Sequence, residues 1–105
     1  PAGLDAPAGD PASVIRVAID GTPQGLELIR TKALDATMSQ PLSAYATKTA
    51  ELIELVSGGG TIEIGPRDDG QVIETPVGPQ YQLKATLVTL DNVDSPDLWA
   101  NQLGK

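Results

Sequence analysis

The longest clean alternation of apolar and polar side chains occupies residues 81–90. Tyr81, Leu83, Ala85 and Leu87 alternate with polar residues, which is the period of a strand with one buried and one solvated face. A strand of this length constrains the rest of the chain, because its unpaired backbone groups need neighbours. We therefore expect the segments immediately before it to pair with it.

Two shorter strands are expected ahead of this one. Residues 61–64 alternate isoleucine with polar residues, and residues 72–75 follow a turn that ends in Asp69 and Gly70. Asp-Gly is a typical pair for a tight hairpin turn. Three consecutive strands with short connections predict an antiparallel meander.

The clearest helix covers residues 41–56. Pro41 suits a first-turn position, where its missing N–H costs nothing, and the glycines at 58–60 end the helix and cap it. The apolar side chains repeat every 3.6 residues and make one narrow stripe. The stripe consists of Leu42, Tyr45, Thr49, Leu52, Ile53 and Val56.

The N-terminal half contains one strand and one segment with two interpretations. Residues 14–20 predict the first strand. Residues 26–38 form a helix if Thr22 is the cap and Pro23 takes the first helical position. The same segment could instead begin as a strand that makes a hairpin with the first one. We favour the helix.

Near the C-terminus, Ser95, Pro96 and Asp97 have the order of a cap, a first-position proline and an acid at the positive end of a helix. We expect a short helix there, with Leu98 and Trp99 packing back on the sheet.

These elements predict an α+β fold. We expect an antiparallel sheet of three to four strands, one or two helices packed on one face, and the short C-terminal helix. The alternative, if residues 26–34 form a strand, is a mostly-β sandwich-like subunit with one helix. Residues 1–12, rich in proline, alanine and glycine, predict an extended arm, and residues 13–105 predict a single globular domain.

Composition excludes several classes of function. The chain has no cysteine and no histidine, so neither a thiolate metal site nor a histidine-based catalytic arrangement can form within it. Fourteen acidic and seven basic residues give a net charge of −7, which disfavours binding to nucleic acid or to an anionic membrane surface. No apolar run is long enough for a membrane helix, and no signal-peptide pattern is visible.

Three motifs could carry chemistry, and each has a simpler interpretation. The glycine-rich turn at residues 20–25 could cradle a phosphate, but its spacing fits no phosphate-binding motif and Asp20 would repel the anion. The glycines at 58–60 follow a helix, which is the reverse of a phosphate-binding loop. Glu63 and Glu74 could face each other on neighbouring strands and share a proton, although Glu63 should point to solvent. We predict that the protein is not an enzyme and that it has no cofactor.

A run of acids and amides near the C-terminus is a weak candidate for binding Ca²⁺. Asp91, Asp94 and Asp97 are its carboxylates, and oxygen ligands are what Ca²⁺ prefers. The run lacks the central glycine and closing glutamate of an EF-hand loop.

Interface residues are predicted in two places. Tyr45, Tyr81 and Trp99 are the only aromatic residues; all three could anchor a core, and Trp99 is the one expected to touch a partner. The other interface candidates lie in the N-terminal arm, and they are Pro1, Leu4, Pro7 and Pro11.

The resulting functional hypothesis is a non-enzymatic structural subunit of a larger assembly, such as a virion or surface-appendage component. Subunit–subunit contacts and the arm would hold it in a homo-oligomer or larger complex. The chain is small and has few aromatic residues, so assembly would supply buried area that its own core lacks. The alternative is a monomeric binding or adaptor module assisted by Ca²⁺. A virion or extracellular surface is favoured over the cytoplasm.

Overall fold

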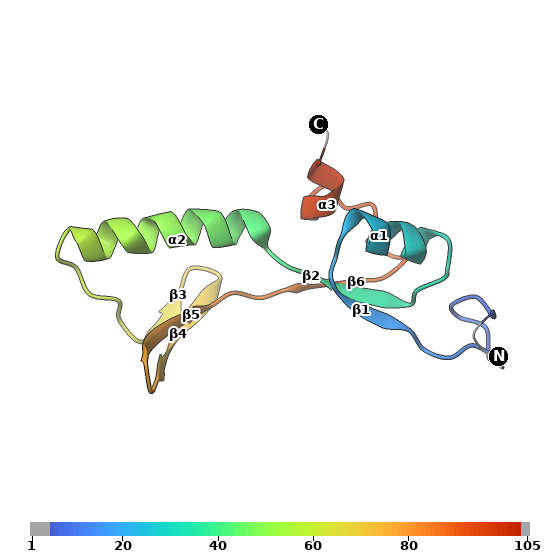
Figure 1. The fold of residues 1–105 in the computed structure, drawn as a ribbon, viewed down its shortest axis with the longest axis horizontal. Coiled ribbons are helices and arrows are strands. Elements are labelled where there is room, and N and C mark those ends of the chain that lie inside the picture. Colours follow the sequence, from blue (N-terminus) through green and yellow to red (C-terminus); the bar gives the residue numbers. More distant parts are fainter. Residues whose placement is uncertain (1–4, 104–105) are drawn as a thin grey trace. The chain divides into compact units, whose positions relative to one another are not determined.

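The computed structural model describes residues 5–103, and the chain falls into two units (Figure 1). Unit 1 contains the chain up to Gln40 and from Ala85 onward, and unit 2 contains Pro41–Lys84. The chain therefore leaves unit 1 once and returns to it once. Each unit has its own sheet.

Unit 1 is a three-stranded mixed sheet with two helices. Its elements in chain order are β1 (Val17–Asp20), α1 (Pro23–Arg30), β2 (Ala36–Ser39), β6 (Thr86–Val88) and α3 (Trp99–Gln102). The strand order is β1-β2-β6, with β1 parallel to β2 and β2 antiparallel to β6. The crossover between the two parallel strands is α1, the usual connection for such a pair.

The start of α1 follows from its local sequence. The Thr22 hydroxyl accepts a 3.1 Å hydrogen bond from the amide of Gly25, which satisfies one of the free N–H groups of the first turn. Pro23 takes the first helical position, where no N–H is needed. Leu26 and Ile29 then lie on one face, and both are buried.

One face of the mixed sheet carries the core of unit 1. The Cα register aligns Ala18, Thr37 and Val88 across the three strands, and Thr37 and Val88 are fully buried. Figure 1 shows α1 and α3 on the same side of this sheet. The buried hydrophobic cluster of this unit consists of Leu26, Ile29, Val88, Val93, Leu98 and Ala100, with Leu34 and Trp99 packed against it.

Unit 2 contains α2 (Leu42–Ser57) and an antiparallel meander of β3 (Gly65–Arg67), β4 (Gly70–Thr75) and β5 (Gly78–Gln82). Its buried hydrophobic residue is Val72 on the central strand, and no residue of α2 is buried. Unit 2 therefore has a much smaller core than unit 1.

The α+β class is confirmed, and so are several local predictions. The helix expected at residues 41–56 is α2, ending in glycines as expected: the amide of Gly58 bonds to the oxygen of Glu54, and Gly59 has a φ of 87°. The strand expected at residues 72–75 lies within β4. Thr22 and Pro23 have the predicted roles.

The strand predicted at residues 81–90 is wrong in its extent. The chain pairs with β4 up to Gln82 and with β2 from Thr86, and residues 83–85 lie in neither sheet. Ten extended residues would span about 33 Å, which exceeds the length of either partner strand. The irregular residues also change the phase, so that Val88 is buried and Leu87 is exposed.

Other boundaries differ from expectation as well. Residues 61–64 are not a strand, because the first strand of the meander is β3. Residues 26–38 are a helix only up to Arg30, and their last part joins β2. The single antiparallel sheet is replaced by two sheets, one of which is mixed because β1 pairs with β2 in parallel.

The C-terminal helix is present but begins later than predicted. It covers Trp99–Gln102 and its N-cap residue is Leu98. The Ser95 hydroxyl does accept a hydrogen bond from the amide of Asp97, at 3.3 Å, but this closes a turn ahead of the helix. Within residues 5–103 no helix combines the length and apolarity needed to cross a bilayer.

Candidate functional site

The second face of the mixed sheet is apolar and uncovered. The register places Ile19, Met38 and Leu87 in one row across the three strands, and Val17 beside Ala36 in the next row. These residues alternate with the core-facing row of the same strands, so they lie on the opposite side from α1 and α3. We call this surface the open face.

The side chains of the open face are strongly exposed. Val17 and Ile19 are each 70% exposed, Leu87 is 57% exposed, and Ile15, which continues the alternation ahead of β1, is 79% exposed. Single exposed aliphatic residues are common on protein surfaces. A contiguous group of them on one sheet face is typical of an interaction site.

The edge of β1 beside this face is open too. The amide of Arg16 donates to Asp35 Oδ2 at 2.8 Å, and its oxygen accepts from the Asp35 amide at 2.9 Å. The backbone N–H and the backbone C=O of Arg16 therefore both point toward β2. The side to which a residue directs its backbone N–H and C=O alternates along a strand. The backbone N–H and C=O groups of Val17 and Ile19 therefore point toward the outer edge of the sheet. β1 contains no proline, lysine or bulge that would discourage pairing.

In unit 2, α2 presents part of its apolar stripe to solvent. Ile53 and Val56 are more than half exposed, and with Leu52 and Ile62 they line a shallow apolar depression of about 330 Å³. The helix that the sequence predicts on a sheet face thus retains an exposed apolar surface.

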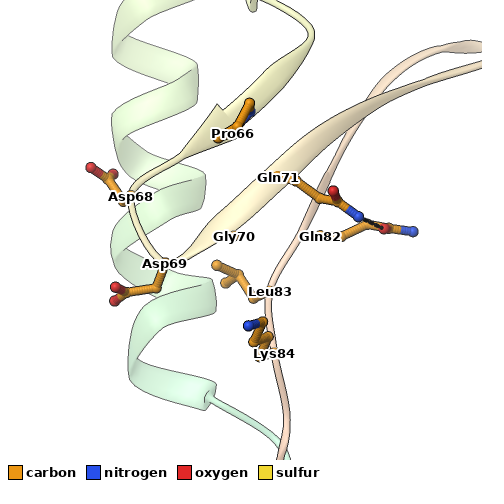
Figure 2. Close-up of a pocket in the computed structure, with 8 residues that line it drawn as sticks. All are labelled: Pro66, Asp68, Asp69, Gly70, Gln71, Gln82, Leu83 and Lys84. Carbon is orange, nitrogen blue, oxygen red and sulfur yellow. Dashed lines mark hydrogen bonds between the residues drawn. The ribbon is translucent and has the colours of Figure 1, made fainter.

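A hollow of about 470 Å³ in unit 2 lies beside the β3–β4 turn. Figure 2 shows the carboxylates of Asp68 and Asp69 pointing away from the amides of Gln71 and Gln82, which are joined to each other by a 3.2 Å hydrogen bond. The lining residues are Pro66, Asp68, Asp69, Gly70, Gln71, Gln82, Leu83 and Lys84. Its polar groups do not converge on a common point, as those of a small-molecule site would.

An ion pair joins α2 to the rim of this hollow. Lys48 Nζ lies 2.7 Å from Asp68 Oδ2 and 3.1 Å from Glu51 Oε2. The hydrogen bond that Lys48 donates to Asp68, followed by the one it donates to Glu51, raises the pKa of Lys48 to about 12. The same bond lowers the pKa of Asp68. Asp68 is exposed and Lys48 is partly exposed, so the pair orients the β3–β4 turn more than it stabilises it.

The predicted calcium residues are distributed along a loop and do not converge. Asp94 pairs with Arg30 at 2.8 Å, and this hydrogen bond raises the pKa of the guanidinium. The amides of Asp91 and Asp97 each bond to a nearby hydroxyl, that of Thr89 or Ser95. Among residues 5–103 no three acidic side chains are grouped as metal ligands would be. Calcium binding stays a prediction.

The turn at residues 20–25 has a structural role. Asp20 has a φ of 93°, and Gly21 is buried with its amide 3.3 Å from the Thr37 hydroxyl. A Cβ on Gly21 would lie 2.6 Å from Ser39, so no other residue fits there. The close approach of the backbone to β2 explains the glycine. Thr22 explains the helix start.

The carboxylate pair expected on neighbouring strands does not form. Glu74 is in β4, opposite Pro79 of β5, whereas Glu63 precedes β3 and belongs to no strand. The premise that these two residues face each other across a ladder is therefore wrong.

The aromatic residues have structural contacts. Trp99 packs against the core of unit 1 and donates from Nε1 to the oxygen of Asp20 at 2.9 Å. The Tyr81 hydroxyl donates to the oxygen of Arg67 at 2.7 Å, and Tyr45 is partly exposed on α2. The contact of Trp99 with a partner stays a prediction.

The described part of the N-terminal arm lies against its own unit. The amide of Ala8 donates to the oxygen of Lys32 at 2.8 Å, and Arg16 donates to the oxygen of Ala6. Pro7 and Pro11 are exposed, while Pro1 and Leu4 lie outside the described residues. The role of these four residues in an interface stays a prediction.

Sequence reasoning missed the open face. The available signal was the near-continuous apolar run of residues 14–20, which has apolar side chains on both faces. That pattern is typical of a strand inside a parallel sheet.

Neither the protein-family models nor the curated proteins that were searched include a match to this chain.

Proposed function

We propose that the protein is a non-enzymatic structural subunit of a larger protein assembly, and that the open face of the mixed sheet is its main contact surface. The observation that carries this proposal is the exposed apolar row on β1, β2 and β6, opposite the face that carries the buried core of unit 1. A contiguous uncovered apolar face of this kind is typical of an interaction site.

The exposed area of the open face limits the free energy that it can contribute to association. Burying the exposed fractions of Ile15, Val17, Ile19 and Leu87 would stabilise a complex by about 4–8 kcal/mol, at roughly 1.5–3 kcal/mol per fully buried aliphatic side chain. Association costs about 4–15 kcal/mol in lost freedom of motion. The open face alone therefore supports a weak complex, and a stable one needs further contacts. The edge of β1 and the apolar stripe of α2 are available to provide them.

Size-exclusion chromatography with light scattering, run over a range of protein concentrations, tests the proposal. We expect the protein to assemble with increasing concentration. The double variant Val17→Thr, Ile19→Thr keeps β-branched side chains but introduces hydroxyls into the contact, and each hydroxyl without a hydrogen-bond partner costs about 1–3 kcal/mol. We expect its association to weaken by at least about tenfold.

Val77→Thr is the matched control, because Val77 is almost fully exposed in the β4–β5 turn. This variant should assemble as the wild type does. A protein that stays monomeric at every concentration, or a double variant that assembles normally, would contradict the proposal. Deletion of residues 1–12 tests separately whether the arm contributes to assembly.

A further inference from the structure

We propose that the edge of β1 binds the same edge of a second copy of this chain, in antiparallel orientation about a two-fold axis at Ala18. This inference rests on the proposed function and adds the identity of the partner and the register of the contact. It is carried by three features of β1: its outward backbone groups, its uncovered apolar side chains, and the order of the charged residues at its two ends.

The first feature is the direction of the unpaired backbone groups. Because Arg16 directs both its N–H and its C=O to Asp35, Val17 and Ile19 direct theirs to the open edge. In an antiparallel pair these two residues would exchange hydrogen bonds with Ile19 and Val17 of the second copy. Because of the two-fold symmetry, each of these hydrogen bonds would occur twice. A strand addition of this kind needs no change in the β1–β2 ladder.

The second feature is the apolar side chain on each of these residues. Directly opposite residues of an antiparallel pair lie on the same face, so Val17 would lie beside Ile19 of the second copy on the open face. Both are β-branched, and such pairs favour a sheet. The open faces of the two copies would then form one continuous apolar surface across six strands.

The third feature is the charge order, which selects the register. With Ala18 on the axis, Arg16, which directly precedes β1, lies opposite Asp20 of the second copy, and this pair occurs twice. The Arg16 guanidinium also donates to the Ala6 oxygen and the Ser13 hydroxyl of its own chain. Shifting the axis to Val17 places Arg16 opposite Ala18 and Asp20 opposite Val14, which removes both pairs. Opposite charges across strands are favourable, by a modest amount. The chosen register also pairs Val17, Ala18 and Ile19 of β1 with the same three residues of the copy.

A crosslinking experiment tests the register directly, because the natural chain has no cysteine. Val17→Cys and Ile19→Cys are prepared separately, mixed and oxidised. In this register the two positions form a hydrogen-bonded pair with Cα atoms about 5.5 Å apart, which suits a disulfide. Identical positions lie on the diagonal, roughly 7–8 Å apart, which does not. We expect a disulfide-linked dimer in the mixture and only background crosslinking in either variant alone.

Val77→Cys, in the exposed β4–β5 turn, measures the background from random collisions. A dimer that forms as well with Val17→Cys alone as in the mixture would overturn the register and therefore the inference. No crosslinking above background would overturn it too. If light scattering still shows assembly in that case, the proposed function stands and only the edge contact fails; a monomer at every concentration removes both.

Hydrogen exchange on the wild-type protein provides a second measurement that needs no substitution. The amides of Val17 and Ile19 should become protected as the protein concentration rises, because only the dimer gives them an acceptor. The amide of Ala18 points toward β2 and should show little change. If the exchange rates of the Val17 and Ile19 amides do not change with protein concentration, the inference is overturned.

Discussion

The indole Nε1 of Trp99 donates a 2.9 Å hydrogen bond to the backbone oxygen of Asp20. Asp20 has a φ of 93°, which takes its backbone out of the strand conformation at the end of β1. The indole thus supplies a hydrogen-bond donor to the carbonyl of the last residue of β1. Through this bond the C-terminal segment holds the turn from which α1 begins.

We expect Trp99→Phe to destabilise unit 1 by about 1 kcal/mol, because it removes one hydrogen bond and leaves an aromatic ring for packing. Chemical denaturation followed by circular dichroism measures the change. Leu103→Ala is the control, since Leu103 is exposed near the same end of the chain, and it should change stability by no more than about 0.5 kcal/mol. A Phe variant as stable as the wild type would show that the bond contributes nothing.

Gly21→Ala should destabilise the protein more than a typical glycine substitution. Gly21 has a φ of 62°, and a Cβ there would lie 2.6 Å from the Cα and Cβ of Ser39. The left-handed conformation alone costs about 1–2 kcal/mol for a residue with a Cβ, and the contact with β2 adds to it. Gly9→Ala isolates the conformational cost, because Gly9 has a φ of 89° and open space around it. Equal losses in the two variants, measured by thermal unfolding, would contradict the role of the Ser39 contact.

Asn101→Ala should destabilise the C-terminal loop by about 3 kcal/mol, at roughly 1 kcal/mol for each of three lost hydrogen bonds. The side-chain amide of Asn101 donates to the oxygens of Val93 and Ser95 at 2.9 and 2.8 Å, and its Oδ1 accepts from Arg30 Nη2 at 3.0 Å. Gln102→Ala is the matched control, because its single bond to Pro96 is exposed and 3.1 Å long. Urea denaturation monitored by the fluorescence of Trp99 compares the two. If both variants lose the same stability, the loop does not depend on Asn101.

How much of this structure the sequence predicts depends on where the determining contacts lie. Thr22, Pro23 and the glycines after α2 act within one turn of a helix, so their roles were predictable. The division of residues 81–90 was not, because it arises when two different strands, far apart in the chain, each pair with half of the segment. Local alternation contains no information about which partner a strand meets.

The local sequence pattern predicts the open face only in part. The alternation in residues 14–20 shows two apolar faces, but it does not say which one faces the core. The structure decides this through α1, whose Leu26 and Ile29 cover the side of Ala18, Thr37 and Val88. The calcium hypothesis depended on the geometry of a loop, and Asp94 is drawn to Arg30, 64 residues away in the sequence.

The ion pair between Lys48 and Asp68 predicts a defined pH dependence of unit 2. Its hydrogen bond lowers the pKa of Asp68 below 3.8, so this contribution is present above that pH and is lost as the pH falls through the lowered pKa. Lys48 has its pKa raised from 10.5 to about 12, so its contribution is complete below 10.5 and is lost as the pH rises toward 12. NMR titration of the Asp68 carboxyl should show its pKa returning toward 3.8 in Lys48→Met. Lys84→Met removes the same charge from the same unit, and it should leave the pKa of Asp68 close to the wild-type value. If both variants raise it equally, the cause is net charge and not the hydrogen bond.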